Sequence, residues 1–115
     1  MKPRRLLDIA TGVALGRLHH KQKFRLAAVG IRGEDGVIVS SYNGAPSEPE
    51  WKHHAESRLC MKLTPDSVVA VVRVHADGSW ALGKPCDGCQ KCLHRRGVKR
   101  VYYTISPNEF GVMLL

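Results

Sequence analysis

The stretch SVVAVVRVH, residues 67–75, is the most apolar run of the chain. A short run of valine and alanine bounded by polar residues is typical of a strand that is buried on both faces of a sheet. We therefore expect residues 67–75 to form the central strand of the fold.

A helix is predicted on each side of this strand along the chain. Residues 53–63, HHAESRLCMKL, form the first helix, which ends before Pro65. Residues 85–97, PCDGCQKCLHRRG, form the second, with a proline at its start and a glycine at its end. Both residue types favour those positions in helices.

The remaining segments complete an α/β pattern. They are an amphipathic helix over the first twenty residues, a β-hairpin of residues 24–32 and 37–44 with its turn at Asp35-Gly36, a strand at 98–106 and a last antiparallel strand at 110–115. The order α-β-β-α-β-α-β-β predicts a three-layer α-β-α sandwich around one mixed five-stranded sheet. We expect residues 1–115 to form a single domain.

The composition sets limits on location and partners. No apolar run approaches the roughly 18–20 residues that span a membrane, so no membrane partner is expected. Four cysteines in a chain without a clear signal peptide indicate a cytoplasmic protein with thiols or a metal site rather than disulfides.

The net charge of +8 is concentrated toward the two ends of the chain. Basic ends around an acidic middle favour partners that carry phosphate, such as a nucleotide or a single-stranded nucleic acid. A basic surface that serves solubility alone is an equally good interpretation of the charge.

Cys86 and Cys89 lie three residues apart at the start of the predicted helix 85–97. Both thiols can face one point near the positive end of the helix dipole, which favours the thiolate form that binds metal. Redox pairs share this spacing, but they commonly follow a strand directly, and Lys84-Pro85 precedes the pair here. Two thiolates with one more protein ligand and an open position make a catalytic zinc site.

The third ligand is expected at the start of the other helix, where His53 and His54 are the candidates. Glu56 follows two residues after His54, and at a helix N-terminus both side chains can point into one cavity. A carboxylate beside a zinc site can take a proton from water and return it to a leaving group. A structural zinc site with Cys92 as fourth ligand is the alternative, but helical geometry places Cys92 a turn further along.

His54-Ala55-Glu56 followed by Pro85-Cys86-Asp87-Gly88-Cys89 resembles the zinc-dependent cytidine and deoxycytidylate deaminase superfamily. The resemblance implies a cytidine deaminase-like fold and one Zn²⁺ per chain, held by His54, Cys86 and Cys89. It implies that Glu56 is the catalytic proton shuttle and that the backbone N–H of Ala55 contacts the substrate. It also implies a homo-oligomer.

The residues that select the substrate follow the family less closely. Ser41-Tyr42-Asn43-Gly44 looks like the segment in which an asparagine contacts the sugar or base, and this suggests that role for Asn43. Arg58 stands where the family usually has an asparagine; it could replace that contact, grip a phosphate, or be a solvated helix residue. Trp51 could stack on a base or anchor its loop.

We therefore predict a zinc-dependent hydrolytic deaminase that converts a cytosine-type base to a uracil-type base, with release of ammonia, in a free nucleoside or nucleotide. One alternative is a deaminase that acts on single-stranded DNA or RNA. The other is a non-catalytic zinc-binding module that binds nucleic acid.

Overall fold

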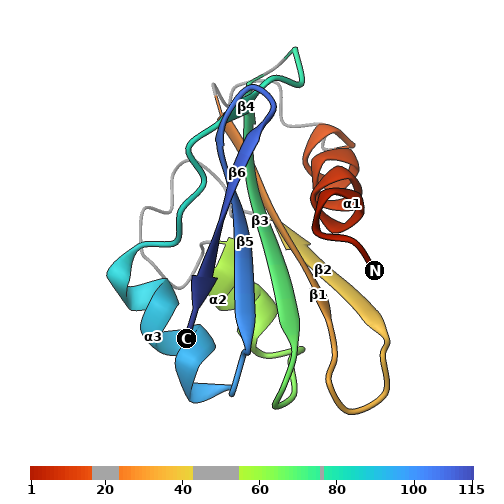
Figure 1. The fold of residues 1–115 in the computed structure, drawn as a ribbon, viewed down its shortest axis with the longest axis vertical. Coiled ribbons are helices and arrows are strands. Elements are labelled where there is room, and N and C mark those ends of the chain that lie inside the picture. Colours follow the sequence, from red (N-terminus) through yellow and green to blue (C-terminus); the bar gives the residue numbers. More distant parts are fainter. Residues whose placement is uncertain (17–23, 43–54, 76) are drawn as a thin grey trace.

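The computed structural model describes residues 1–16, 24–42, 55–75 and 77–115. Within these ranges the elements are, in chain order, α1 (Pro3–Leu15), β1 (Phe24–Ile31), β2 (Ile38–Tyr42), α2 (Ala55–Cys60), β3 (Val68–His75), β4 (Trp80–Ala81), α3 (Asp87–Arg95), β5 (Arg100–Ser106) and β6 (Glu109–Leu114). The predicted order of helices and strands is confirmed, with one short strand added (Figure 1).

The strands form one mixed sheet in the order β2-β1-β3-β5-β6. β1 pairs antiparallel with both β2 and β3, β3 pairs parallel with β5, and β5 pairs antiparallel with β6. β3 therefore has a full-length neighbour in β1 and lies in the middle of the sheet, as its apolar sequence predicts.

The short strand β4 was missed by the prediction of five strands. β5 pairs with β3 from Val68 to Val71, and β4 pairs with the next part of β3, at Arg73 and Val74. β4 thus pairs with the part of β3 that lies beyond the end of the β3–β5 pairing. Two residues between a turn and a loop carry too short an alternation to indicate a strand.

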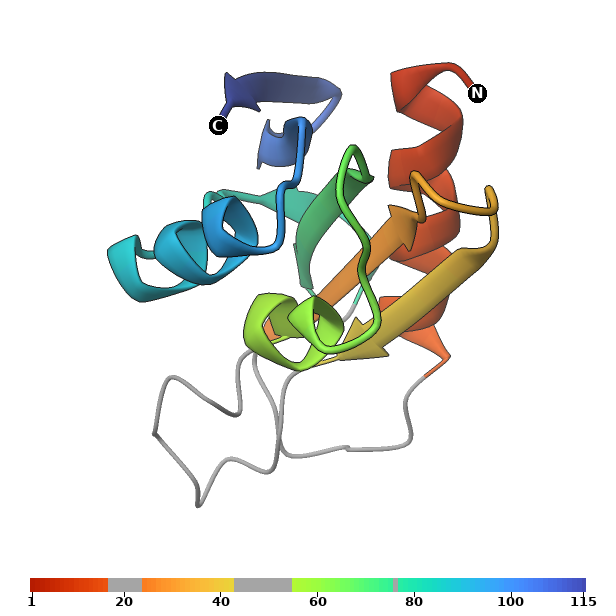
Figure 2. The same cartoon turned by 90° about the horizontal axis from the view of Figure 1, so that it is seen from below.

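The three layers follow from which face of the sheet each helix covers. α1 lies on one face, and α2 and α3 lie side by side on the other (Figures 1 and 2). On the α1 face, Leu6 and Leu7 pack with Val72 and Val74. On the opposite face, Leu59 of α2 and Leu93 of α3 pack with Val69 and Val71. Successive β3 residues thus alternate between two apolar cores, which confirms the α-β-α sandwich.

Local sequence signals explain where the elements begin and end. Pro3 opens α1 and the helix ends at Leu15, earlier than the predicted first twenty residues. Gly36 has a φ of 72°, as its turn requires, and the Asp35 carboxylate accepts a hydrogen bond of 3.0 Å from the Val37 N–H. Gly97 has a φ of 78° just after α3.

In the described part of the chain, no helix is long and apolar enough to cross a membrane.

Candidate active site

The first turns of α2 and α3 carry the described part of the candidate site. Ala55 and Glu56 open α2, and Cys86 is the N-cap of α3, with Cys89 in its first turn. The two helices pack through Leu59 and Leu93. At their other ends the Arg96 Nε donates a hydrogen bond of 2.7 Å to the Cys60 carbonyl.

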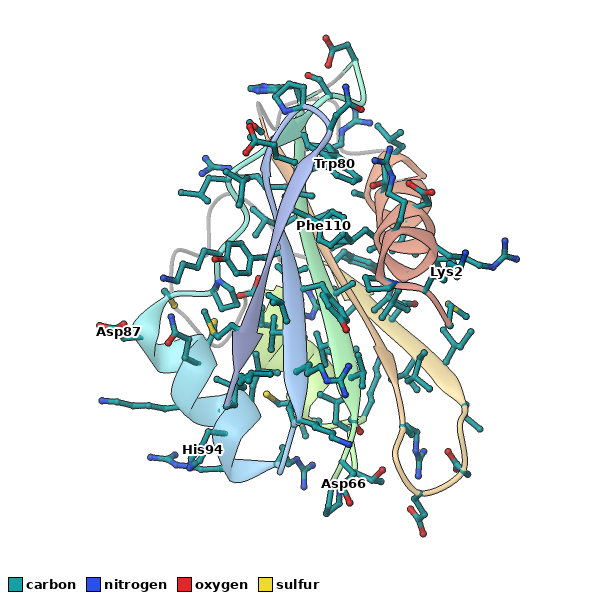
Figure 3. All side chains as sticks on the ribbon, in the orientation of Figure 1. Lys2, Asp66, Trp80, Asp87, His94 and Phe110 are labelled. Carbon is teal, nitrogen blue, oxygen red and sulfur yellow. The ribbon has the colours of Figure 1, made fainter. Side chains whose placement is uncertain are left out.

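Hydrogen bonds hold Cys86 at the start of α3. Cys86 has an extended backbone, with φ −68° and ψ 167°, and its carbonyl accepts the first helical hydrogen bond from Gln90, at 2.9 Å. The Gln90 side chain also donates to the Pro85 carbonyl, at 2.8 Å. These bonds fix the chain on both sides of Cys86. Asp87 and His94, labelled in Figure 3, lie near the two ends of this helix.

Glu56 meets the cysteine pair in the interior. Its side chain is 2% exposed and Cys89 is fully buried, whereas Cys86 is exposed. The Cys89 thiol donates a hydrogen bond to the Glu56 carboxylate and also contacts the Cys86 thiol. Ala55, beside Glu56, is fully buried and small. One carboxylate and two sulfur atoms from two helices therefore converge.

The electrostatics of this cluster oppose additional negative charge. Burial, the neighbouring Glu56 carboxylate and the Cys86 thiol together raise the pKa of the Cys89 thiol well above its usual value. Burial and the neighbouring carboxylate thus outweigh, at Cys89, the stabilisation of the thiolate that the helix N-terminus predicts.

These donors fit a zinc ion. Thiolates are zinc ligands, and a divalent cation would offset the repulsion between the carboxylate and the two sulfur atoms. Within the described ranges no group of three histidine, cysteine or acidic side chains has the arrangement of a metal site. The predicted third ligand, His54, lies outside the described residues, as do the predicted substrate contacts Asn43 and Trp51.

Arg58 lies away from this cluster. It is exposed, and its guanidinium carbon is 5.2 Å from the centre of the Tyr42 ring. Two residues along a helix correspond to a rotation of about 200°, so Arg58 and Glu56 leave α2 in nearly opposite directions. The contact with Tyr42 connects α2 to the end of β2, and the sequence gives no signal for it.

Cys60 and Cys92 form a second thiol pair, which no spacing in the sequence indicates. Cys60 is buried, as expected for a small apolar residue, and the two side chains are hydrogen-bonded. Burial and the Cys92 thiol raise the pKa of Cys60 above its usual range. Cys92 is partly buried against the core on the α2 and α3 face.

The fold, with the starts of α2 and α3 next to each other, corresponds to a known family of proteins. The model of the cytidine and deoxycytidylate deaminase zinc-binding region matches residues 2–105. The chain therefore belongs to this family of zinc-dependent deaminases. The comparison with curated proteins gave no significant match.

Solved structures of cytidine deaminases share the fold. The enzyme from Burkholderia pseudomallei superposes with a TM-score of 0.72 at 18% identity, over 99% of this chain and 93% of that one. The Mycobacterium leprae enzyme gives 0.61 at 18% identity, over 97% and 93%. The Mycobacterium tuberculosis enzyme gives 0.56 at 19% identity, over 92% and 90%. At these identities the likeness shows a cytidine deaminase-like fold.

Proposed function

We propose that residues 1–115 act as one zinc-dependent hydrolytic deaminase unit. Its substrate is a cytosine-type base in a free nucleoside or nucleotide, and its products are the uracil-type base and ammonia. Family membership supports the reaction class. The observation that carries the proposal is the buried Glu56 carboxylate in contact with Cys89, between the starts of two helices.

In this proposal His54, Cys86 and Cys89 hold one zinc ion. When bound, zinc acts as a Lewis acid that makes water a nucleophile at neutral pH. The family carries a zinc-binding region, and the described sulfur donors suit the metal. The helical hydrogen bond and the Gln90 side chain fix the backbone around Cys86 and so hold this donor at the start of α3.

Glu56 moves the proton. Its carboxylate accepts a proton from the attacking water as oxygen adds to C4 of the pyrimidine. It gives this proton to the ring nitrogen, then takes the proton of the new C4 hydroxyl group and gives it to the amino group, so that the C4–N bond breaks, C4=O forms and ammonia leaves. One water is consumed and one ammonia is released. Since the side chain is buried, its proton transfers take place away from bulk solvent, where electrostatic interactions are stronger.

The substrate contacts are assigned by position in the sequence. The backbone N–H of Ala55, next to Glu56, contacts the reacting base, Asn43 contacts the sugar or base, and Trp51 stacks on it. Arg58 acts on the substrate only indirectly, because its guanidinium packs on Tyr42, which directly precedes Asn43 and so helps to position it. We also propose that the chain acts as a homo-oligomer, which sedimentation at several protein concentrations would measure.

A substrate panel tests the proposal. Zinc-loaded protein is incubated with cytosine, cytidine, deoxycytidine, their monophosphates and cytosine-containing single-stranded oligonucleotides, and the base products are separated by chromatography. We expect turnover of a nucleoside or nucleotide. Turnover of oligonucleotides alone, with binding that collapses between low and moderate salt, would instead support the nucleic-acid alternative. Zinc binding without turnover of any compound would support the non-catalytic module.

A further inference from the structure

A cavity of about 760 Å³ lies between the end of β2 and the C-terminal ends of α2 and α3. Four cationic side chains line it, namely Arg58, Lys62, Arg95 and Arg96. We call it the basic cavity. Its volume lies within the range of about 300–1,000 Å³ that is usual for pockets that bind small molecules.

The charge of the basic cavity is not balanced by its own walls. No carboxylate is among the lining residues that the structure describes. The ion pairs formed within the described ranges join Arg4 to Asp8, and Arg32 to its neighbouring carboxylates, and so involve none of the four cations. A concave surface with four positive charges attracts an anion.

Hydrogen bonds hold two of these cations at the walls. The Lys62 Nζ donates to the Ser40 carbonyl at 2.6 Å, and the Arg96 Nε donates to the Cys60 carbonyl at 2.7 Å. Both acceptors are neutral, so the bonds position the charges without cancelling them. Each bond uses one donor and leaves further N–H groups of the same side chain for a ligand.

The rest of the lining is largely apolar. The Tyr42 ring, beneath the Arg58 guanidinium, and the side chains of Met61, Cys60 and Cys92 contribute to it. Met61 is 81% exposed, an unusual position for a large apolar side chain. Cationic groups beside aromatic and sulfur-containing surface suit a ligand that combines a phosphate with a flat apolar body.

The basic cavity is separate from the candidate active site. Glu56, Cys86 and Cys89 are absent from its lining. Arg95 follows Cys89 by six residues of helix α3, which corresponds to about 9 Å along the axis. A ligand in the basic cavity would therefore occupy the C-terminal ends of α2 and α3, whose opposite ends carry the candidate active site.

We propose that the basic cavity is a second binding site, which takes a nucleoside monophosphate. The phosphate contacts the arginine and lysine groups, and the base and sugar lie against the Tyr42 and Met61 side. This inference rests on the cavity and its charge and holds whether or not the chain is a deaminase.

Binding of guanosine 5′-monophosphate, measured by calorimetry at low salt, tests the proposal. This probe lacks a cytosine-type base, and guanosine is the matched probe without phosphate. We expect the monophosphate to bind and guanosine to bind at least about tenfold more weakly, a difference of about 1.4 kcal/mol. Arg95→Glu should weaken binding of the monophosphate by at least about tenfold. Lys2→Glu, an equal change of charge at an exposed position at the start of α1 on the other face of the sheet, should leave it within about twofold.

Several results would overturn the proposal. They are no binding of the monophosphate to the unchanged protein, equal binding of guanosine, or equal losses in Arg95→Glu and Lys2→Glu. Binding of a six-nucleotide single-stranded DNA with no binding of the mononucleotide would also overturn it. So would sedimentation that shows a second copy of the chain covering this face, if Arg95→Glu dissociates the oligomer. Far-ultraviolet circular dichroism of each variant verifies that it is folded.

Discussion

Thr104 of β5 offers a sharp test of how the sheet is held together, because one hydroxyl serves two strands. Its Oγ1 donates a hydrogen bond of 2.7 Å to the Ala81 carbonyl of β4 and accepts one of 3.1 Å from the Arg73 N–H of β3. The residue is fully buried. Thr104→Val keeps the size and branching of the side chain but leaves one part-buried carbonyl and one part-buried N–H without this partner.

The expected cost follows from those two groups. A buried polar group that loses its hydrogen bond costs about 1–3 kcal/mol, so Thr104→Val should lower the free energy of unfolding by roughly 2–4 kcal/mol. For a chain of this length such a loss corresponds to a fall in Tm of roughly 10 °C. The measurement is urea unfolding followed by circular dichroism, together with a thermal melt.

Thr104→Ser is the matched control, because it keeps the hydroxyl and removes one buried methyl group. It should cost about 1 kcal/mol, and therefore less than the valine variant. If Thr104→Val were as stable as the unchanged protein, or more stable than Thr104→Ser, the hydroxyl would not hold β3 and β4 as argued.

Three further substitutions test the packing of the helices and of the hairpin. Leu93→Ala removes a fully buried side chain that packs α3 on the sheet, and it should lower the free energy of unfolding in urea by about 2–5 kcal/mol. Leu82→Ala, at an exposed position, should lower it by less than about 0.5 kcal/mol. Equal losses in the two variants would contradict the assigned core. Trp80→Phe loses the 3.0 Å hydrogen bond from Nε1 to the threonine hydroxyl of α1 and should lower stability by about 0.5–1.5 kcal/mol; an unchanged melt would refute that contact. Gly33→Ala would place a Cβ 2.1 Å from the Pro65 carbonyl oxygen and should lower the free energy of unfolding by at least about 1–3 kcal/mol. An unchanged stability would show that the backbone at Gly33 lies further from Pro65 than described.

The sequence contains most of the fold in a readable form. The run 67–75 predicts a central strand because both of its faces are apolar, and the structure pairs it with neighbours on both sides. Asp35-Gly36 predicts the hairpin because glycine accepts the positive φ that the turn needs. β4 could not be predicted, because two residues carry no readable alternation and its partners, β3 and the Thr104 hydroxyl, are not adjacent to it in sequence.

The candidate site was predictable in its spacing and less so in its environment. The HAE and PCxxC spacings place Glu56 and the cysteine pair at two helix starts, where the structure finds them. Cys89 is buried against Glu56, whereas Cys86 is exposed. This difference depends on how α2 and α3 pack, which the spacing does not specify. The stacking of Arg58 on Tyr42 joins two elements that no local pattern connects.

Trp80 illustrates the same limit. The structure buries Trp80 against α1 (Figure 3), and no local pattern in the sequence indicates this contact. Its ring lies 4.5 Å from the Arg4 guanidinium carbon. The direction in which a two-residue strand presents its side chain is set by the sheet and not by the residues beside it.

Glu56→Gln tests the central claim most directly. The amide keeps the size of the buried side chain but accepts no proton from water, so it should keep one zinc ion per chain while turnover of the best pyrimidine substrate falls by at least about 10²–10⁴-fold. Glu109→Gln, at an exposed carboxylate of β6, should keep both. Zinc is counted by atomic emission and turnover by ammonia release. A Glu56→Gln variant that retained zinc and full turnover would contradict the assignment of this site.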